Sequence, residues 1–185
     1  CHCLLPARGR HGFGQSDPAL EGCRNPMAEQ PSPALDPLHI SWMRRALQLA
    51  RAAEDLGEVP VGAVIVRDGE ALSEAHNRTV GDSDPCAHAE VLAIRAASAV
   101  QGDWRLRDTV LYVTLEPCAM CAGAIVLARI PHVVFATPDP KAGMAGSLEN
   151  LLQDERLNHR CEVTGGVLGK EASELLKGFF RARRG

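Results

Sequence analysis

The sequence lacks any long apolar run. No stretch approaches the roughly 18 to 20 consecutive apolar residues that a membrane helix needs, and the N-terminal residues hold no apolar signal core. These absences predict a cytoplasmic protein that does not enter a membrane. Hydrophobic residues make up 45% and charged residues 23% of the 185 residues, which is typical of a globular protein and excludes the composition of a disordered one. The length suits one domain with a substantial core.

The chain also lacks the cysteine pattern of a disulfide framework. Its seven cysteines are an odd number, are unevenly spread and come without a secretory signal, so metal binding is the more informative interpretation. There is no charge excess either, since the net charge of -3 gives no global attraction to nucleic acid. A local cluster is present near the end of the chain, where Lys177, Arg181, Arg183 and Arg184 follow one another without an intervening acid. Such a cluster is either an RNA-binding patch or a solvated helix end favoured by the helix dipole.

The first 37 residues are predicted to lie outside the folded domain. They hold six of the twelve prolines and show no sustained apolar period. The chain begins with Cys1, whereas Met27 opens the stretch that runs into the first predicted helix. Residues 1–26 are therefore interpreted as upstream readthrough, a tag or an extension. We assign residues 1–37 to a disordered leader or non-native extension and residues 38–185 to the functional domain.

The rest of the chain alternates between helix and strand patterns. Asp36 and Pro37 begin a predicted helix whose apolar residues recur at helical spacing. A hairpin is predicted over residues 61–76, turning at Asp68 and Gly69. This order predicts an α/β fold, a three-layer α/β/α sandwich with a central mixed sheet of about five strands and with functional residues at helix starts. The further predicted elements are helices over residues 87–100, 118–129 and 170–181 and strands over residues 110–113, 133–135 and 162–164.

Three candidate zinc ligands lie at the starts of two predicted helices. Cys118 and Cys121 have the spacing that lets two sulfurs bind one metal ion, and His88 opens the other helix. Peptide N–H groups at a helix start favour the thiolate forms of the cysteines. Only three good ligands are visible, which leaves a fourth position for water and favours a catalytic over a structural zinc site. Cys86 would close the site as a fourth ligand, but we expect it to be a passive residue after Pro85.

Glu90 is the candidate for moving protons. A carboxylate beside an activated water can accept its proton and return it to a departing amine. Residues two apart do not face the same way on an ideal helix, so Glu90 and His88 converge only if the helix start is arranged for it. Taken singly, the histidine also fits a helix cap, and the two cysteines fit a redox pair or half of a structural zinc site. Together, His-x-Glu and Pro-Cys-x-x-Cys are the signature of zinc-dependent nucleobase deaminases.

From about Ile40 to Arg184 the sequence resembles the bacterial-type tRNA-specific adenosine deaminases of the cytidine deaminase-like superfamily. The resemblance implies that fold, with one zinc ion per subunit held by His88, Cys118 and Cys121 and with proton transfer by Glu90. It implies hydrolytic deamination of adenosine to inosine at the wobble position of a tRNA anticodon by zinc-bound hydroxide, with release of ammonia. Besides the zinc motifs, the matching segments include Glu58-Val59-Pro60-Val61-Gly62-Ala63-Val64, His76-Asn77-Arg78, Leu111-Tyr112-Val113-Thr114-Leu115-Glu116, Asp139-Pro140-Lys141, Gly146-Ser147-Leu148 and Phe179-Phe180.

The resemblance also implies how the tRNA anticodon stem-loop is bound. Asn77 would contact the base, and Asp139 with Lys141 would belong to the loop that holds the anticodon strand. Ordinary turn roles are the alternative for Asn77 and Asp139. The family usually forms a homodimer, for which the alanine-rich helix over residues 119–128 is a candidate surface, although its alanines fit internal packing on the sheet equally well. No organic cofactor is implied.

Two other functions stay open on the sequence alone. An enzyme of the same fold could deaminate a free base or nucleotide, such as guanine or a cytidine compound, with the same zinc site. The loop from Asp139 to Leu148 and the basic C-terminal cluster argue against it, because a small substrate requires neither. A non-catalytic zinc module that binds RNA or a partner subunit is the other alternative, and it would have no need for an acid at Glu90.

Overall fold

A computed structural model describes residues 36–184, and the leader predicted for residues 1–37 lies almost entirely outside them. Helix α1 (Pro37–Asp55) begins at the predicted N-cap, where the Asp36 carboxylate accepts a hydrogen bond from the Leu38 amide at 2.8 Å. The predicted hairpin is formed by β1 (Gly62–Arg67) and β2 (Glu70–His76). The other elements are α2 (Ala89–Gln101), β3 (Val110–Leu115), α3 (Ala119–Ala128), β4 (His132–Thr137), the short 3-10 helix η2 (Leu151–Gln153), β5 (Glu162–Gly165) and α4 (Gly169–Ala182).

The five strands form one mixed sheet in the order β2-β1-β3-β4-β5. Strand β1 pairs antiparallel with β2 and with β3, whereas β3, β4 and β5 run parallel. Parallel neighbours need a crossover connection, and α3 supplies it between β3 and β4. The predicted α/β class and the sheet of about five strands are confirmed.

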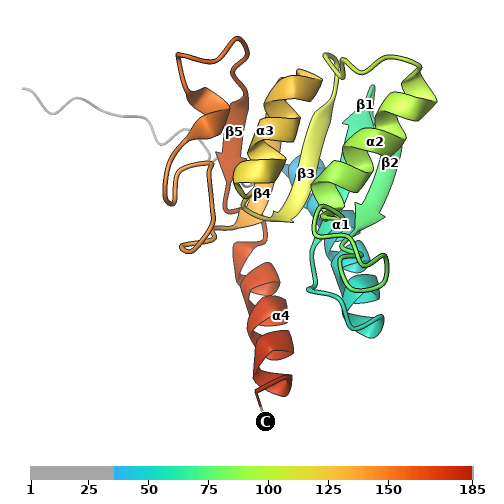
Figure 1. Ribbon diagram of the computed structural model, residues 1–185, viewed down its shortest axis with the longest axis vertical. Helices are drawn as coiled ribbons and strands as arrows, with labels where there is room; N and C mark the ends of the chain where they lie inside the picture. Colours follow the sequence, from blue (N-terminus) through green and yellow to red (C-terminus); the bar gives the residue numbers. More distant parts are fainter. Residues whose placement is uncertain (1–35, 185) are drawn as a thin grey trace, which may run out of the picture. The chain divides into compact units, whose positions relative to one another are not determined.

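Helices cover both faces of this sheet, which confirms the predicted three layers. Helices α2 and α3 lie side by side on one face (Figure 1), and α1 and the first turns of α4 pack on the other. Alternate strand residues therefore enter two separate cores, with Ile65 in the core on the α2 side and Val64 in the core on the α1 side. Gly62 allows α1 to approach the sheet closely, because a Cβ at this position would lie 2.1 Å from the Ala46 carbonyl oxygen.

One edge of the sheet gathers the segments that carry the candidate site. The register pairs Gly62 with His76, Ala63 with Val113 and Leu115 with Thr137. The start of β1 therefore lies at the same edge as the ends of β2, β3 and β4. Helices α2 and α3 both begin at this edge, as expected for a site in an open α/β sheet. No helix in the described part of the chain is long and apolar enough to cross a membrane.

Candidate metal centre and substrate groove

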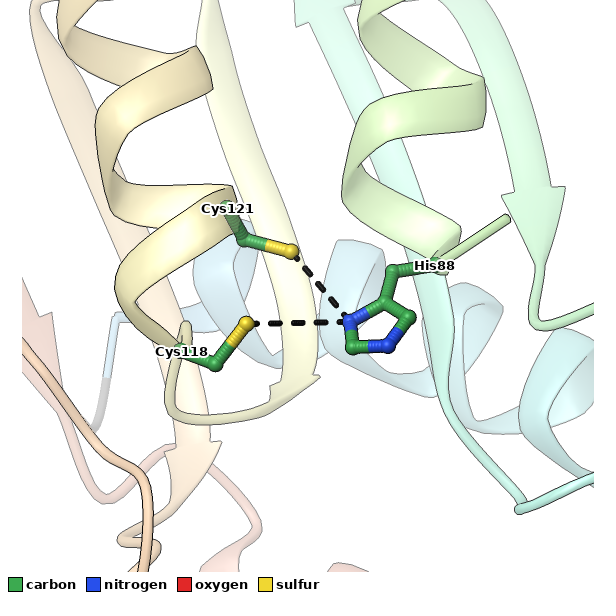
Figure 2. Close-up of side chains that lie close together, drawn as sticks. All are labelled: His88, Cys118 and Cys121. Carbon is green, nitrogen blue, oxygen red and sulfur yellow. Dashed lines mark hydrogen bonds between the residues drawn. The ribbon is translucent and has the colours of Figure 1, made fainter. Parts of the chain in front are cut away.

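His88, Cys118 and Cys121 lie within reach of a single metal ion. The sulfurs of Cys118 and Cys121 lie 3.7 and 3.5 Å from Nδ1 of His88, and the three ligand atoms are all within 4.8 Å of one another (Figure 2). Zinc bonds of about 2.3 Å to sulfur and about 2.0 Å to nitrogen, at tetrahedral angles, would separate sulfur from nitrogen by about 3.5 Å. The spacing of the side chains therefore fits a tetrahedral zinc ion bound through Nδ1.

Two neighbouring helix starts bring these ligands together. His88 is the N-cap residue of α2 and Cys118 is that of α3, and both have extended backbones. Neither side chain bonds to an amide of its own helix, so His88 occupies the N-cap position without capping the helix through its imidazole. Cys121 lies in the first turn of α3 and faces His88 across the gap between the two helices (Figure 2).

The cluster has three protein donors and an open side. In residues 36–184 no other histidine, cysteine or acidic side chain joins this group. Cys86 is exposed and stands outside it, which agrees with its expected passive role. Cys121 is buried, whereas His88 and Cys118 are partly exposed. Three ligands with access from solvent are the arrangement of a catalytic zinc site.

Cys118 is the more acidic of the two thiols in the cluster. The pKa of the Cys118 thiol is lowered to about 4, first by its hydrogen bond with Cys121 and, in spite of burial, also by its hydrogen bond with His88. The pKa of the Cys121 thiol moves up, first because of the hydrogen bond with Cys118. The pKa of His88 is raised, chiefly by its hydrogen bond to the same thiolate. A metal ion that binds here therefore meets a thiolate at Cys118 and displaces a proton from Cys121.

Glu90 is a buried residue beside the cluster. It is the second residue of α2 and only 4% exposed, and burial raises the pKa of its carboxyl group. Its charge contributes to the raised pKa of the Cys121 thiol, after the larger effects of Cys118 and burial, which places the carboxylate near that sulfur. The backbone is extended at His88 and becomes helical at Ala89, so the offset of an ideal helix does not separate the two side chains.

Asn77 fixes the start of α2. Its Oδ1 accepts a hydrogen bond from the Ala89 amide at 2.9 Å, and the residue is only 7% exposed. Asn77 thereby supplies the cap that His88 does not provide. Its Nδ2 group has no hydrogen-bond partner among the described residues. The Asn77 side-chain oxygen is therefore committed to the fold.

Asp139 and Lys141 line a groove of about 1000 Å³. Residues 137–141 form one wall and α4 forms the other. The metal ligands do not line the groove, but Leu115 does, three residues before Cys118. Asp139 Oδ1 accepts a hydrogen bond from the Lys141 amide at 2.9 Å, which is the turn contact expected of an aspartate in this position.

Cations outnumber acids along this groove. Three of the four cations in the C-terminal cluster line it, together with the half-exposed ring of Phe180. Arg183 instead stacks on Phe179, 4.4 Å from the ring centroid, and donates a hydrogen bond to the Gly57 carbonyl. It therefore anchors α4 and does not face the groove. The charged lining residues are Lys141, Lys177, Arg181 and Arg184 with the acids Asp139 and Glu174.

Sequence reasoning missed two buried carboxylates next to the site. Glu116 is 2% exposed and accepts hydrogen bonds from the segment 139–147. Glu58 is 3% exposed and accepts hydrogen bonds from the amides of Val80 and Gly81 at 3.1 and 2.7 Å. Both residues belong to motifs that carry the family resemblance. Nothing in those motifs indicates that the charge is buried, because acidic side chains are mostly exposed.

Known proteins are similar to this chain in both sequence and fold. Residues 38–184 match the MafB19-like deaminase family. A tRNA-specific adenosine deaminase from Bacillus subtilis (strain 168) is 51% identical over 143 residues, which cover 77% of this chain and 89% of that protein. A solved structure from a study of A-to-I editing by tRNA:A34 deaminases at the wobble position of transfer RNA has a TM-score of 0.71 and 41% identity, covering 74% of this chain and 99% of that chain.

A guanine deaminase from Bacillus subtilis aligns less completely. Its structure has a TM-score of 0.52 and 44% identity, covering 54% of this chain and 64% of that chain. The closer overall agreement with the tRNA:A34 deaminase structure confirms the predicted cytidine deaminase-like sandwich. This chain therefore belongs to the MafB19-like deaminase family and, within it, to the tRNA-specific adenosine deaminases.

Proposed function

We propose that this protein hydrolytically deaminates the wobble adenosine of a tRNA anticodon to inosine and releases ammonia. The observation that carries the proposal is the cluster of three zinc donors with the buried Glu90 beside it. The groove between residues 137–141 and α4 supports an RNA substrate, because it carries an excess of cations and an aromatic ring. The relatives are named for tRNA adenosine deamination, which supports the same substrate.

One zinc ion per subunit is the proposed cofactor. One imidazole and two thiols are donors that zinc prefers, and the sulfur-to-nitrogen distances of 3.5 and 3.7 Å suit a tetrahedral ion. Zinc in a three-ligand site supplies a water molecule activated for attack. His88, Cys118 and Cys121 would hold the ion and leave its fourth position to water.

Glu90 is proposed to move the protons of the reaction. Deamination joins the oxygen of water to C6 of adenine and breaks the bond from C6 to the amine nitrogen, which leaves as ammonia. One proton must therefore leave the water and one must reach the amine. The Glu90 carboxylate accepts the first and, once protonated, donates it to the amine. The raised pKa suits both steps, because the group binds a proton more readily and holds it until the amine departs.

Contacts to the RNA are proposed for three predicted residues. Asn77 would use its Nδ2 donor on the base, since its oxygen is engaged by α2. Asp139 and Lys141 would hold the anticodon strand along the groove, where Phe180 offers a ring on which a base can stack. An adenosine in an anticodon loop can be splayed out at a modest unstacking cost, which suits a pocket reached through a groove.

The double variant Lys177→Ala/Arg181→Ala should bind the stem-loop more weakly and with less salt dependence. Each lost phosphate contact lowers the slope of log affinity against log salt by about 0.7 for a single strand. We expect KM, measured from inosine formation across a salt series, to rise. Metal analysis should give an unchanged zinc content. Lys170→Ala is the matched control, because Lys170 is exposed on α4 but does not line the groove. Equal salt slopes for wild type and the double variant would contradict this role.

Conversion of an anticodon stem-loop tests the substrate class. We expect the wild-type protein to form inosine from a stem-loop with adenosine at the wobble position, with release of one ammonia per inosine. Free adenosine, guanine and cytidine should not be turned over. Turnover of these small compounds but not of the stem-loop would favour a reaction like that of the guanine deaminase relative.

We also propose a homodimer and a cytoplasmic location, where tRNA is found. Some alanines of α3 pack internally against the sheet, and others are available for contact with a second subunit. Ala122 and Ala128 are buried in the core, whereas Ala124 lies on an outer face with Gly123 and Leu127, the last of which is 70% exposed. This apolar outer face supports the dimer, which sedimentation of the purified protein would check.

A further inference from the structure

We infer that Glu116 is a positioning residue that holds the segment 139–147, here called the groove loop, in the conformation that forms the substrate groove. The inference rests on the proposed function, because it treats the groove as the site of the RNA strand. Glu116 does not line the groove itself. It acts through the groove loop, three of whose residues, Asp139, Pro140 and Lys141, do line it.

Both carboxylate oxygens of Glu116 are occupied by this loop. Oε2 accepts hydrogen bonds from the Asp139 amide at 2.9 Å and from the Ser147 hydroxyl. Oε1 accepts hydrogen bonds from the amides of Ala145 and Ser147, each at 2.9 Å. Glu116 is 2% exposed, and no cation in the described part of the chain forms an ion pair with it. A buried charge without a cation depends on such donors, so the loop and the carboxylate stabilise each other.

The groove loop closes tightly around this carboxylate. A Cβ at Gly143 would lie 2.3 Å from Cδ of Glu116, so only glycine permits this approach. The Met144 amide donates a hydrogen bond to the Pro117 carbonyl at 2.9 Å, and Gly143 pairs with Cys118 in an isolated bridge. The loop is therefore fixed to the three-residue segment that runs from Glu116 into the metal centre.

This arrangement joins the groove wall to the catalytic end of the protein. Between the Asp139 and Ala145 amides the chain makes its own turn, with the Gly143 amide bonded to the Asp139 carbonyl at 2.9 Å. Contacts to Glu116, Pro117 and Cys118 attach that turn to the start of α3, and the Leu151 amide donates a further hydrogen bond to the Met144 carbonyl at 2.9 Å. The position of the Lys141 side chain relative to the metal centre therefore depends on the Glu116 carboxylate.

Glu116→Gln is the variant that removes the clamp with the least change in shape. A glutamine keeps one acceptor oxygen, but its NH2 group donates where Glu116 accepts. If the oxygen stays toward Ala145 and Ser147, the NH2 group opposes the Asp139 amide and releases the end of the loop that lines the groove. We expect KM for the stem-loop to rise about tenfold, because a buried donor loses its acceptor. kcat and zinc content should stay within about twofold of wild type, since no ligand or proton carrier changes.

Hydrogen exchange gives a readout that does not depend on activity. The amides of Asp139, Ala145 and Ser147 should exchange faster in Glu116→Gln than in wild type, whereas α2 should be unaffected. Gly143→Ala should have the same two effects, because its Cβ displaces the carboxylate. Ser147→Ala removes the hydroxyl donor alone and should raise KM less, in a protein that retains the three amide contacts.

Glu70→Gln is the matched control for the lost charge. Glu70 is exposed at the start of β2, at the opposite edge of the sheet, and its replacement should change neither KM nor exchange in the groove loop. Unchanged exchange in Glu116→Gln, or faster exchange with an unchanged KM, would overturn the inference. Loss of zinc, or a fall in kcat with KM unchanged, would overturn it as well. Absence of inosine formation by wild type would overturn the proposed function instead, while exchange still reports on the clamp.

Discussion

Glu90→Gln should keep its fold and its zinc and lose turnover by a factor of about 10² to 10⁴, the usual contribution of a general acid and base. The amide has the shape of the carboxyl group but cannot accept a proton from water or donate one to the departing amine. KM for the stem-loop should change little, because Glu90 does not line the groove. Inosine formation over a range of stem-loop concentrations gives turnover and KM, and metal analysis of the same preparation gives the zinc content.

Thermal stability gives this variant a second expected result. Burial raises the pKa of the Glu90 carboxyl group, which means that the folded protein disfavours the charged form. A neutral amide avoids that cost, so Glu90→Gln should melt at the same temperature as wild type or higher. Glu70→Gln, on the exposed start of β2, is the control for loss of one negative charge. Wild-type turnover by Glu90→Gln would remove Glu90 from the mechanism.

Cys121→Ser should lose both zinc and activity. Changes in the outer shell of a zinc site already weaken metal binding by about 10- to 100-fold, and the loss of a direct donor should weaken it more. We expect wild type to contain one zinc ion per subunit and the variant to contain almost none after dialysis. The measurements are elemental analysis and inosine formation on the same preparations.

Cys86→Ser is the control for this metal prediction, because Cys86 is exposed and lies outside the ligand cluster only two residues before His88. It should retain full zinc and full turnover. A chelator should lower the melting temperature of wild type and of Cys86→Ser, since a bound metal stabilises the folded state, but it should leave Cys121→Ser unchanged. Zinc loss in Cys86→Ser would make Cys86 a fourth ligand and would argue for a structural site.

Local signals in the sequence predicted most of the fold. The turn at Asp68 and Gly69 was predictable because both residues tolerate positive φ, and they adopt φ values of 52° and 79°. Asp36 and Pro37 fixed the start of α1 for an equally local reason. The predicted start of the third helix at Cys118 was one residue early, because Cys118 is the extended N-cap before Ala119.

The candidate site was predictable only where its chemistry follows from short motifs. The spacing of Cys118 and Cys121 suggests a metal site by itself. The position of His88 Nδ1 near both sulfurs depends on how closely α2 and α3 approach each other. The contacts of Glu116 join residues 23 to 31 positions apart, and no local pattern encodes them. Arg183 and Arg184 look alike in sequence, yet only one of them lines the groove. Their difference depends on how α4 packs.

The polarity of the sheet has a practical consequence for labelling this protein. Every segment assigned to chemistry or to RNA leaves from one edge, whereas the hairpin turn at Asp68 and Gly69 leaves from the other and is exposed. A Cβ at Gly69 would meet nothing within 4 Å, so the turn has free space around it. A fluorophore or short affinity insert placed there stands a full strand length away from the zinc ligands and the groove loop. A probe attached at that turn should therefore report RNA binding without disturbing the groove.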